Sequence, residues 1–193
     1  MQVQNLKMLQ SNYYSERFDL EDKVTREYPQ DIARYNSQIK ALKVDIETAN
    51  KTLKASADYF SGMDINGVHY TEKKAAGEAI IRIMKSFKNS SETLPVGSYR
   101  GFTMEMYISR GFRLEYILAI RGAMTHTINL GTDTLGNITR IDNCIDHLAG
   151  DFEEAEKNLA ETEKQLEIAK ESLKEPFEQA EELAEKQERL DDD

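Results

Sequence analysis

Apolar positions recur every three or four residues along the C-terminal part of the chain. The stripe comprises Ile138, Ile141, Ile145, Leu148, Phe152, Ala155, Leu159, Leu166, Ala169, Leu173, Ala180, Leu183 and Leu190. Such a repeat is typical of a coiled-coil seam, in which a helix buries one face against a partner helix with the same repeat. Because the intervening positions are rich in Glu and Lys, this helix cannot be stable alone. The pattern therefore predicts a long C-terminal helix that needs a second one.

A stripe with the same spacing lies in the N-terminal third of the chain, after a looser repeat that runs from Leu6 to Val24. Its members are Ile32, Tyr35, Ile39, Leu42, Ile46, Ala49, Leu53 and Phe60. The pair Ser61-Gly62 provides a helix stop. We therefore expect two coiled-coil arms, residues 1–61 and 138–193, that pair as an antiparallel hairpin of helices.

Both arms contain a proline, which lacks an amide donor and disfavours helix in the residue before it. We expect a break near Pro29 in the first arm and near Pro176 in the second. If Phe60 lies opposite Ile141, equal rise along the two helices places Pro29 opposite about Ser172. The two breaks would then form one shared kink.

Residues 62–137 follow a different pattern and predict a small α/β head. The segment 65–70 contains Asn66-Gly67, a pair that favours the tight turn of a hairpin. Thr71 is expected to cap a helix whose apolar face runs from Ala75 to Phe87. A loop is expected to follow, over residues 89–97.

Three strand-like runs then span residues 99–108, 112–120 and 124–130, with turns at Arg110-Gly111 and Arg121-Gly122. They predict an antiparallel sheet with one helix packed on it. The fold class expected for the whole chain is α+β, mainly α. It consists of a long antiparallel two-helix coiled-coil stalk with the α/β head inserted at one tip.

Composition and the distribution of charge add to this description. The mean hydropathy of −0.64 and the aromatic share of 8% are low for a compact globule of 193 residues, which indicates extended, solvated structure. Residues 1–61 carry nine basic and nine acidic side chains, residues 62–140 carry ten and seven, and residues 141–193 carry six and nineteen. The head is therefore mildly basic, and the C-terminal arm is strongly acidic.

Membrane-spanning proteins and secreted proteins are disfavoured by the sequence. No apolar run approaches the roughly 18 residues of a membrane span, and the polar segment after Met1 does not have the pattern of a signal peptide, so we expect a cytoplasmic protein.

The single cysteine, Cys144, has no second cysteine for an internal disulfide and falls in an apolar-periodic helix, where it is expected to serve as a packing residue.

The basic side chains of the head are candidates for contact with DNA or a protein partner. Arginines interleaved with aromatic residues on a small sheet can hold phosphates and stack on bases. An excess of three positive charges is small for a nucleic-acid domain, however, and ordinary solubility is the alternative. The candidate contact residues are Lys73, Lys74, Tyr99, Arg100, Arg110, Arg113 and Arg121.

Carboxylates of the C-terminal arm form a candidate acidic partner surface, represented by Glu153, Glu154, Glu156 and Glu163. The alternative is a solvated helix face. His147 has Asp142, Asp146 and Asp151 at helical spacing, but a solvated face is again the simpler interpretation, and no metal site is expected. No cofactor is expected either.

Five segments resemble one known group of proteins. They are residues 13–22 (YYSERFDLED), 28–33 (YPQDIA), 70–79 (YTEKKAAGEA), 135–143 (LGNITRIDN) and 176–183 (PFEQAEEL). Together they resemble the C-terminal region of large helicase and adenine-methylase proteins of phages and conjugative elements of Gram-positive bacteria, over nearly the whole chain. The resemblance implies a module that accompanies DNA processing by mobile elements, or a free-standing relative of one, and implies no catalysis.

Catalytic motifs of those enzymes are absent from the sequence. No glycine precedes a lysine, which excludes a Gly-Lys-Ser/Thr phosphate loop, and no two prolines are adjacent, which excludes the methylase tetrapeptide. We expect no enzyme. Three functions remain: an accessory module whose stalk is a spacer and whose head contacts DNA or a partner, an acidic anti-CRISPR-type inhibitor that blocks DNA binding by an RNA-guided nuclease, and a coiled-coil stalk that forms a homodimer.

Overall fold

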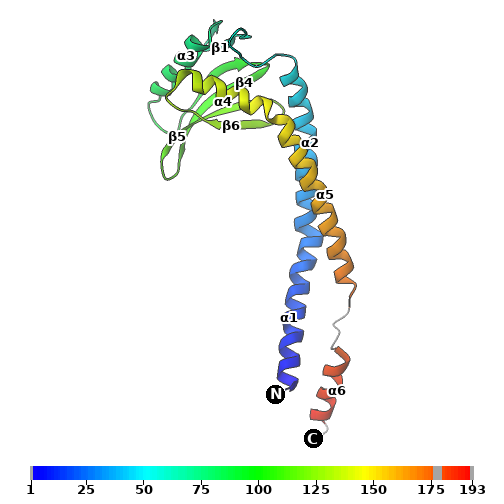
Figure 1. Ribbon diagram of the computed structural model, residues 1–193. Helices are drawn as coiled ribbons and strands as arrows, with labels where there is room; N and C mark the ends of the chain where they lie inside the picture. The colour runs from blue at the N-terminus through cyan, green and yellow to red at the C-terminus, as the bar shows by residue number, and fades with distance from the viewer. Residues whose placement is uncertain (1, 176–179, 192–193) are drawn as a thin grey trace. The chain divides into compact units, whose positions relative to one another are not determined.

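A computed structural model describes residues 2–175 and 180–191, and the chain divides into two compact units (Figure 1). The sheet unit comprises residues 37–155, and the helical unit comprises residues 1–36 and 156–193. Helices predominate, and all strands belong to one antiparallel sheet. The expected α+β, mainly α class is thereby confirmed.

The sheet unit is built on six strands in the order β2-β1-β3-β4-β5-β6, with every neighbouring pair antiparallel. The strands are β1 (Met63–Ile65), β2 (Val68–Tyr70), β3 (Thr93–Tyr99), β4 (Phe102–Arg110), β5 (Leu114–Arg121) and β6 (Thr125–Asn129). The hairpin predicted at Asn66-Gly67 is confirmed, and φ values of 51° and 83° at these residues explain the need for Asn and Gly.

One strand was not expected. Residues 93–97 of β3 were assigned to a loop because Pro95 and Gly97 are turn-forming residues. The proline is accommodated at a register shift between Pro95 and Gly97. Gly97 lies so close to the Asp64 carbonyl that a Cβ atom there would overlap with it.

Two helices, rather than the single one expected, contact each other beside the sheet (Figure 1). They are α3 (Lys73–Lys85) and α4 (Thr134–Asp146). Alternate β4 residues Phe102, Met104 and Met106 are buried in the core with Ile80 of α3. The expected cap at Thr71 is wrong, because Glu72 is the N-cap residue and it makes no side-chain capping bond.

The predicted helix over residues 138–190 consists of separate helices. α4 already begins at Thr134, and a turn at His147 separates it from α5 (Leu148–Leu173), which α6 (Ala180–Asp191) follows. The break expected near Pro176 lies outside the described residues.

The helix α2 (Tyr28–Asn50) ends ten residues before Phe60, which corrects the expected extent of the first arm. Leu53 is 72% exposed, and the Phe60 ring packs against Tyr99 instead of extending a seam. The carbonyl of Ala49 near the end of α2 accepts a hydrogen bond from Arg100. The Arg100 side chain thereby supplies the hydrogen bond that this carbonyl would receive from a backbone N–H if the helix continued.

In the helical unit, the chain stays helical across Pro29, so the break or kink expected near this residue takes the form of an irregular helical turn rather than an end of the helix. α1 (Gln2–Asp22) passes into α2 through η1 (Lys23–Glu27), a π-helical turn in which the Tyr28 N–H bonds the Lys23 carbonyl five residues back. Pro29 offers no N–H, and its ring would clash with the carbonyl four residues earlier. The widened turn is a known way for a helix to accommodate such an interruption.

The register expected between the arms is wrong. Arg17 Nη2 donates to the Leu173 carbonyl, and the Tyr13 hydroxyl donates to the Glu175 carbonyl at 2.9 Å. Residues near Arg17, rather than Pro29, therefore lie across from Ser172. The expected register depended on Phe60 being helical, and that residue lies beyond the end of α2.

Within the sheet unit, the buried carboxylate of Asp45 joins α2 to the β5–β6 turn. It accepts the N–H groups of Ala123 at 2.7 Å and Met124 at 3.1 Å, and His126 Nε2 lies 2.7 Å from it. Asp45 is 1% exposed. The carboxylate therefore fixes the position of the turn through bonds that water cannot replace.

Asp45→Asn is expected to lower the free energy of unfolding by about 2–3 kcal/mol, because it removes a buried charge-assisted acceptor and leaves a donor unpaired. Urea unfolding followed by circular dichroism measures this. Glu47→Gln, at an exposed carboxylate of the same helix, is the control and should change stability by less than about 0.5 kcal/mol. Equal stabilities of the two variants would contradict the role of Asp45.

Candidate nucleic-acid interface at the β4–β5 turn

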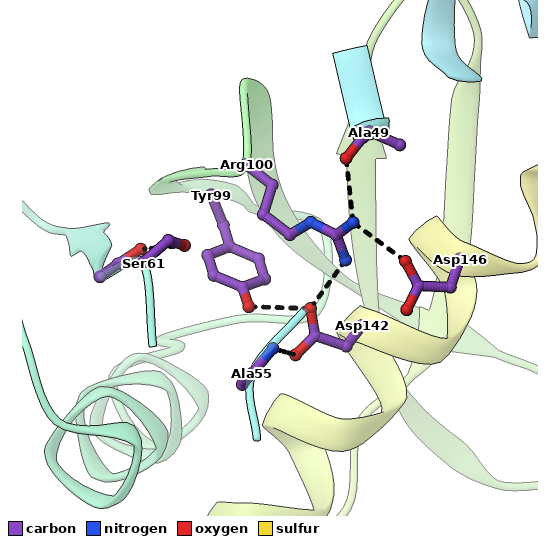
Figure 2. A network of polar contacts seen from close by, with 8 residues as sticks. Ala49, Ala55, Ser61, Tyr99, Arg100, Asp142 and Asp146 are labelled. Atoms are coloured by element: carbon purple, nitrogen blue, oxygen red, sulfur yellow. Dashed lines mark hydrogen bonds and ion pairs between the residues drawn. The ribbon is translucent and has the colours of Figure 1, made fainter. Parts of the chain in front are cut away.

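The basic residues expected to form one contact surface are distributed over different environments. Arg100 is buried in a polar network that Figure 2 shows from close by. Its Nη1 donates to Asp142 Oδ1 at 3.0 Å, and its Nη2 contacts the Ala49 carbonyl at 3.0 Å and Asp146 Oδ1 at 2.9 Å. Its backbone adopts a left-handed φ of 50° at the β3–β4 turn. A guanidinium held in this way has no face for a phosphate, so Arg100 is removed from the contact set.

Tyr99 belongs to the same network. Its hydroxyl donates to Asp142 Oδ1 at 2.8 Å, and the Ala55 N–H donates to Asp142 Oδ2 at 3.0 Å (Figure 2). Burial, followed by the hydrogen bond to the Asp142 carboxylate, raises the pKa of Tyr99 well above its ordinary value. Tyr99 is 2% exposed, which likewise leaves it no face for a base.

Lys73, Lys74 and Arg121 lie on elements other than the β4–β5 turn. Lys73 and Lys74 are adjacent at the start of α3, where Lys73 Nζ donates to the Ser56 carbonyl and Lys74 is exposed. Arg121 pairs with Glu105 at the end of β5, and Thr103 of β4 is the residue opposite Arg121 in the sheet. Arg110 lies seven residues from Thr103 along β4, about 23 Å at the usual rise of a strand. Arg121 therefore does not form one patch with Arg110.

Arg110 and Arg113 do lie together, at the turn between β4 and β5 that projects from the sheet (Figure 1). Arg110 pairs with Leu114, so only residues 111–113 connect the strands, and the Gly111 N–H bonds the Arg113 carbonyl. Both arginines are exposed. Between them, Phe112 has a relative exposure of 105%, and Leu114 is 69% exposed. We call Arg110, Phe112 and Arg113 the basic tip.

A neighbouring loop adds polar groups beside the basic tip. Arg110 Nη2 donates to the Ser90 hydroxyl, and the exposed Lys88 belongs to the same loop. Phe87 at the start of this loop packs edge-on against Tyr116 of β5, with ring centroids 5.8 Å apart. The aromatic contact holds the loop against the hairpin, so the basic tip has a fixed polar neighbour.

Phe112 was missed by the sequence analysis because an apolar residue in a strand-like run is normally assigned to the core. The available signal was its position directly after Arg110-Gly111, a predicted turn. An aromatic side chain in a short turn between two arginines has no strand face on which to be buried. Exposed aromatic residues flanked by positive charge are the groups that proteins use to stack on unpaired bases.

His147, the neighbouring carboxylates and the Cys144 thiol were the remaining candidates for chemistry on the C-terminal helices. His147 Nε2 lies 3.5 Å from Asp151 Oδ1, and among the described residues no three His, Cys, Asp or Glu side chains gather in a way that fits a metal ion. Burial, and then the charge of Asp151, raise the pKa of Cys144, which keeps the thiol protonated. No described helix is long and apolar enough to cross a membrane.

The acidic candidates Glu153, Glu154, Glu156 and Glu163 are all exposed on α5. None of the four forms an ion pair with another described residue. Each carboxylate is therefore accessible to solvent and to a partner.

Comparison with known proteins adds no relative. No protein-family model, curated protein or solved structure matches the chain. The resemblance to mobile-element helicase and methylase proteins stays a prediction from the sequence.

Raising the pH is expected to reduce the contribution of Tyr99 to the free energy of unfolding. The folded-state pKa lies above the ordinary value of 10.0, so the stabilisation is complete below pH 10 and is lost as pH rises above it, where the unfolded chain releases the proton and the folded one does not. The difference in unfolding free energy between the parent and Tyr99→Phe should therefore shrink from pH 8.5 to about pH 11. Urea unfolding at each pH measures it, with Tyr107→Phe as the control, and a constant difference would contradict this assignment.

Proposed function

We propose that the chain is a non-catalytic interaction module that binds DNA through the basic tip. The observation that carries this proposal is the fully exposed ring of Phe112 between two exposed arginines. Burial usually stabilises an aromatic side chain by about 1.5–3 kcal/mol, and this turn leaves both Phe112 and Leu114 in water. Exposed apolar side chains grouped beside positive charge support a binding role. Arginines beside it supply the charge that a phosphate backbone requires.

Single-stranded DNA fits this site better than duplex. A phenylalanine ring stacks on a base only where the base is not already stacked between its neighbours, whereas arginines contact phosphates of either form. The tip is narrow, since three residues connect the strands. It can therefore contact only a few nucleotides, and we propose weak binding that serves to position a larger assembly.

The helical unit is proposed to be a spacer. Side-chain bonds from Tyr13 and Arg17 reach backbone carbonyls at the end of α5, and Ala169 is buried, as a coiled-coil seam requires. A pairing of the two arms as a coiled-coil stalk would hold the DNA-binding tip at a distance from an attached enzyme. The resemblance found in the sequence favours a mobile-element DNA-processing system as that setting.

Two variants of the basic tip separate its two contributions to binding. Arg110→Ala with Arg113→Ala should reduce the slope of log K against log salt by about 1.4, because each lost contact with a single strand removes about 0.7. Phe112→Ala should weaken binding by about 1–3 kcal/mol and leave the slope unchanged. Fluorescence anisotropy with a labelled oligothymidine at 20–150 mM salt measures both.

Arg121→Ala is the control for charge, because it removes one exposed arginine about 23 Å from the tip. Its effect on affinity should be less than twofold. A loss in Arg121→Ala about half, in free energy, of that in the double arginine variant would show that only net charge matters. Binding that is unchanged in all variants would exclude the basic tip as the DNA site.

A second candidate is an acidic inhibitor of an RNA-guided nuclease. The four exposed and unpaired glutamates of α5 favour it, because carboxylates on a helix present negative charge where a nuclease expects phosphates. Reversal of Glu153, Glu154, Glu156 and Glu163 to Lys should then abolish inhibition of DNA binding by such a nuclease, with helicity preserved. Tip variants should have no effect in that assay, which distinguishes the two candidates.

A further inference from the structure

β6 forms one edge of the sheet, and the pairing pattern determines which of its backbone groups face outward. At one end of the β5–β6 ladder the Leu130 N–H bonds the Tyr116 carbonyl, and at the other the Gly122 N–H bonds the Met124 carbonyl. Hydrogen-bonded pairs alternate along an antiparallel ladder, so His126 and Ile128 also face β5. The N–H and C=O groups of Thr125, Thr127 and Asn129 therefore point away from the sheet.

A groove of about 680 Å³ lies along this edge, between β6 and α4. Thr127 and Asn129 line it on the strand side, and Ile128 and Cys144 contribute apolar and thiol surface. The opposite edge strand, β2, has only three residues. β6 is therefore the longer of the two edge strands on which a further strand could pair, and the groove beside it can hold side chains of that strand.

Asn137 holds the groove open by joining α4 to the chain just after β6. Its side chain is fully buried, accepts the Gly131 N–H at 2.8 Å and donates to the Gly131 carbonyl at 2.9 Å. This pair of bonds fixes the distance between the strand end and the helix. The bonds therefore hold α4 beside the strand at one end of the groove.

The charge at one end of the groove is positive. Arg140 lies beside Gly131, and its Nη1 donates to Asn137 Oδ1 at 2.9 Å. Among the described residues no carboxylate pairs with Arg140, whereas His147 and Asp151 at the other end contact each other. A carboxylate near the Asn129 end of the strand would therefore meet an uncompensated guanidinium.

We propose that this groove binds an extended peptide that adds a seventh strand to the sheet beside β6 and places an acidic side chain against Arg140. An edge strand selects a partner in extended conformation because its outward donors and acceptors recur at every second residue. The charge of Arg140 selects an acidic one. Such a site would attach the chain to a partner protein while the basic tip, at a different place on the sheet unit, stays free.

Hydrogen exchange followed by NMR tests the backbone part of this proposal. In the free protein the Thr127 and Asn129 amides should exchange faster than those of His126 and Ile128, which bond β5. An acetylated peptide of alternating valine and threonine ending in two glutamates is the probe. Its addition should slow exchange at Thr127 and Asn129, whereas a version ending in two lysines should bind at least fivefold more weakly.

Two variants locate the binding site. Thr127→Pro removes an outward N–H without removing a bond to β5, and should abolish peptide binding. Arg140→Gln should weaken binding of the acidic peptide at least fivefold and leave the lysine version unchanged, which keeps the proposal testable if the proline variant does not fold. Arg82→Gln, on α3, is the control for charge and should bind as the parent does.

Three results would overturn the proposal. The first is the absence of saturable binding by the acidic peptide at millimolar concentration. The second is binding that neither Thr127→Pro nor Arg140→Gln weakens. The third is slower exchange at Thr127 and Asn129 in the protein alone as its concentration rises, which would assign the edge to pairing between two copies of the chain. None of these results depends on DNA binding by the basic tip.

Discussion

The buried pair of Arg100 and Asp142 is the interaction on which the sheet unit depends. The carboxylate of Asp142, on the helix α4, bonds both the β3–β4 turn and the segment after α2. Arg100 also bonds the Ala49 carbonyl near the end of α2. A buried charge without its partner costs about 3–5 kcal/mol, a large fraction of the stability of an ordinary domain. The network thus requires these segments to adopt their positions together.

This network also determines which arginines are available for binding. Arg100 is buried and bonds two carboxylates and a carbonyl, whereas Arg121 pairs with Glu105 and stays exposed. Arg110 and Arg113 lie at a turn where the sheet ends, and an exposed aromatic residue lies between them. Residues of one type in one region of sequence therefore serve different purposes. The difference follows from burial and from nearby carboxylates, which only the fold reveals.

The sequence predicted those parts of the fold that local patterns determine. Asn66-Gly67 required a hairpin turn, alternating apolar residues marked β4, and strand-like runs between turn residues marked β5 and β6, because each pattern reflects backbone geometry within a few residues. It did not predict β3, whose turn-forming residues are accommodated at a register shift, nor the end of α2 at Asn50, where a distant side chain bonds a helix carbonyl. Of the candidate site, Arg110 and Arg113 were predicted, whereas the exposure of Phe112 and the burial of Arg100 depend on contacts distant in sequence.

A double-mutant cycle on Arg100 and Asp142 tests the central claim most directly. Unfolding free energies would be measured in urea for Arg100→Met, Asp142→Asn and the two combined. If the pair organises the sheet unit, each single variant loses several kcal/mol and the combined variant loses less than their sum by about 1–3 kcal/mol. Losses that add within about 0.5 kcal/mol, or an Arg100→Met protein as stable as the parent, would contradict the claim.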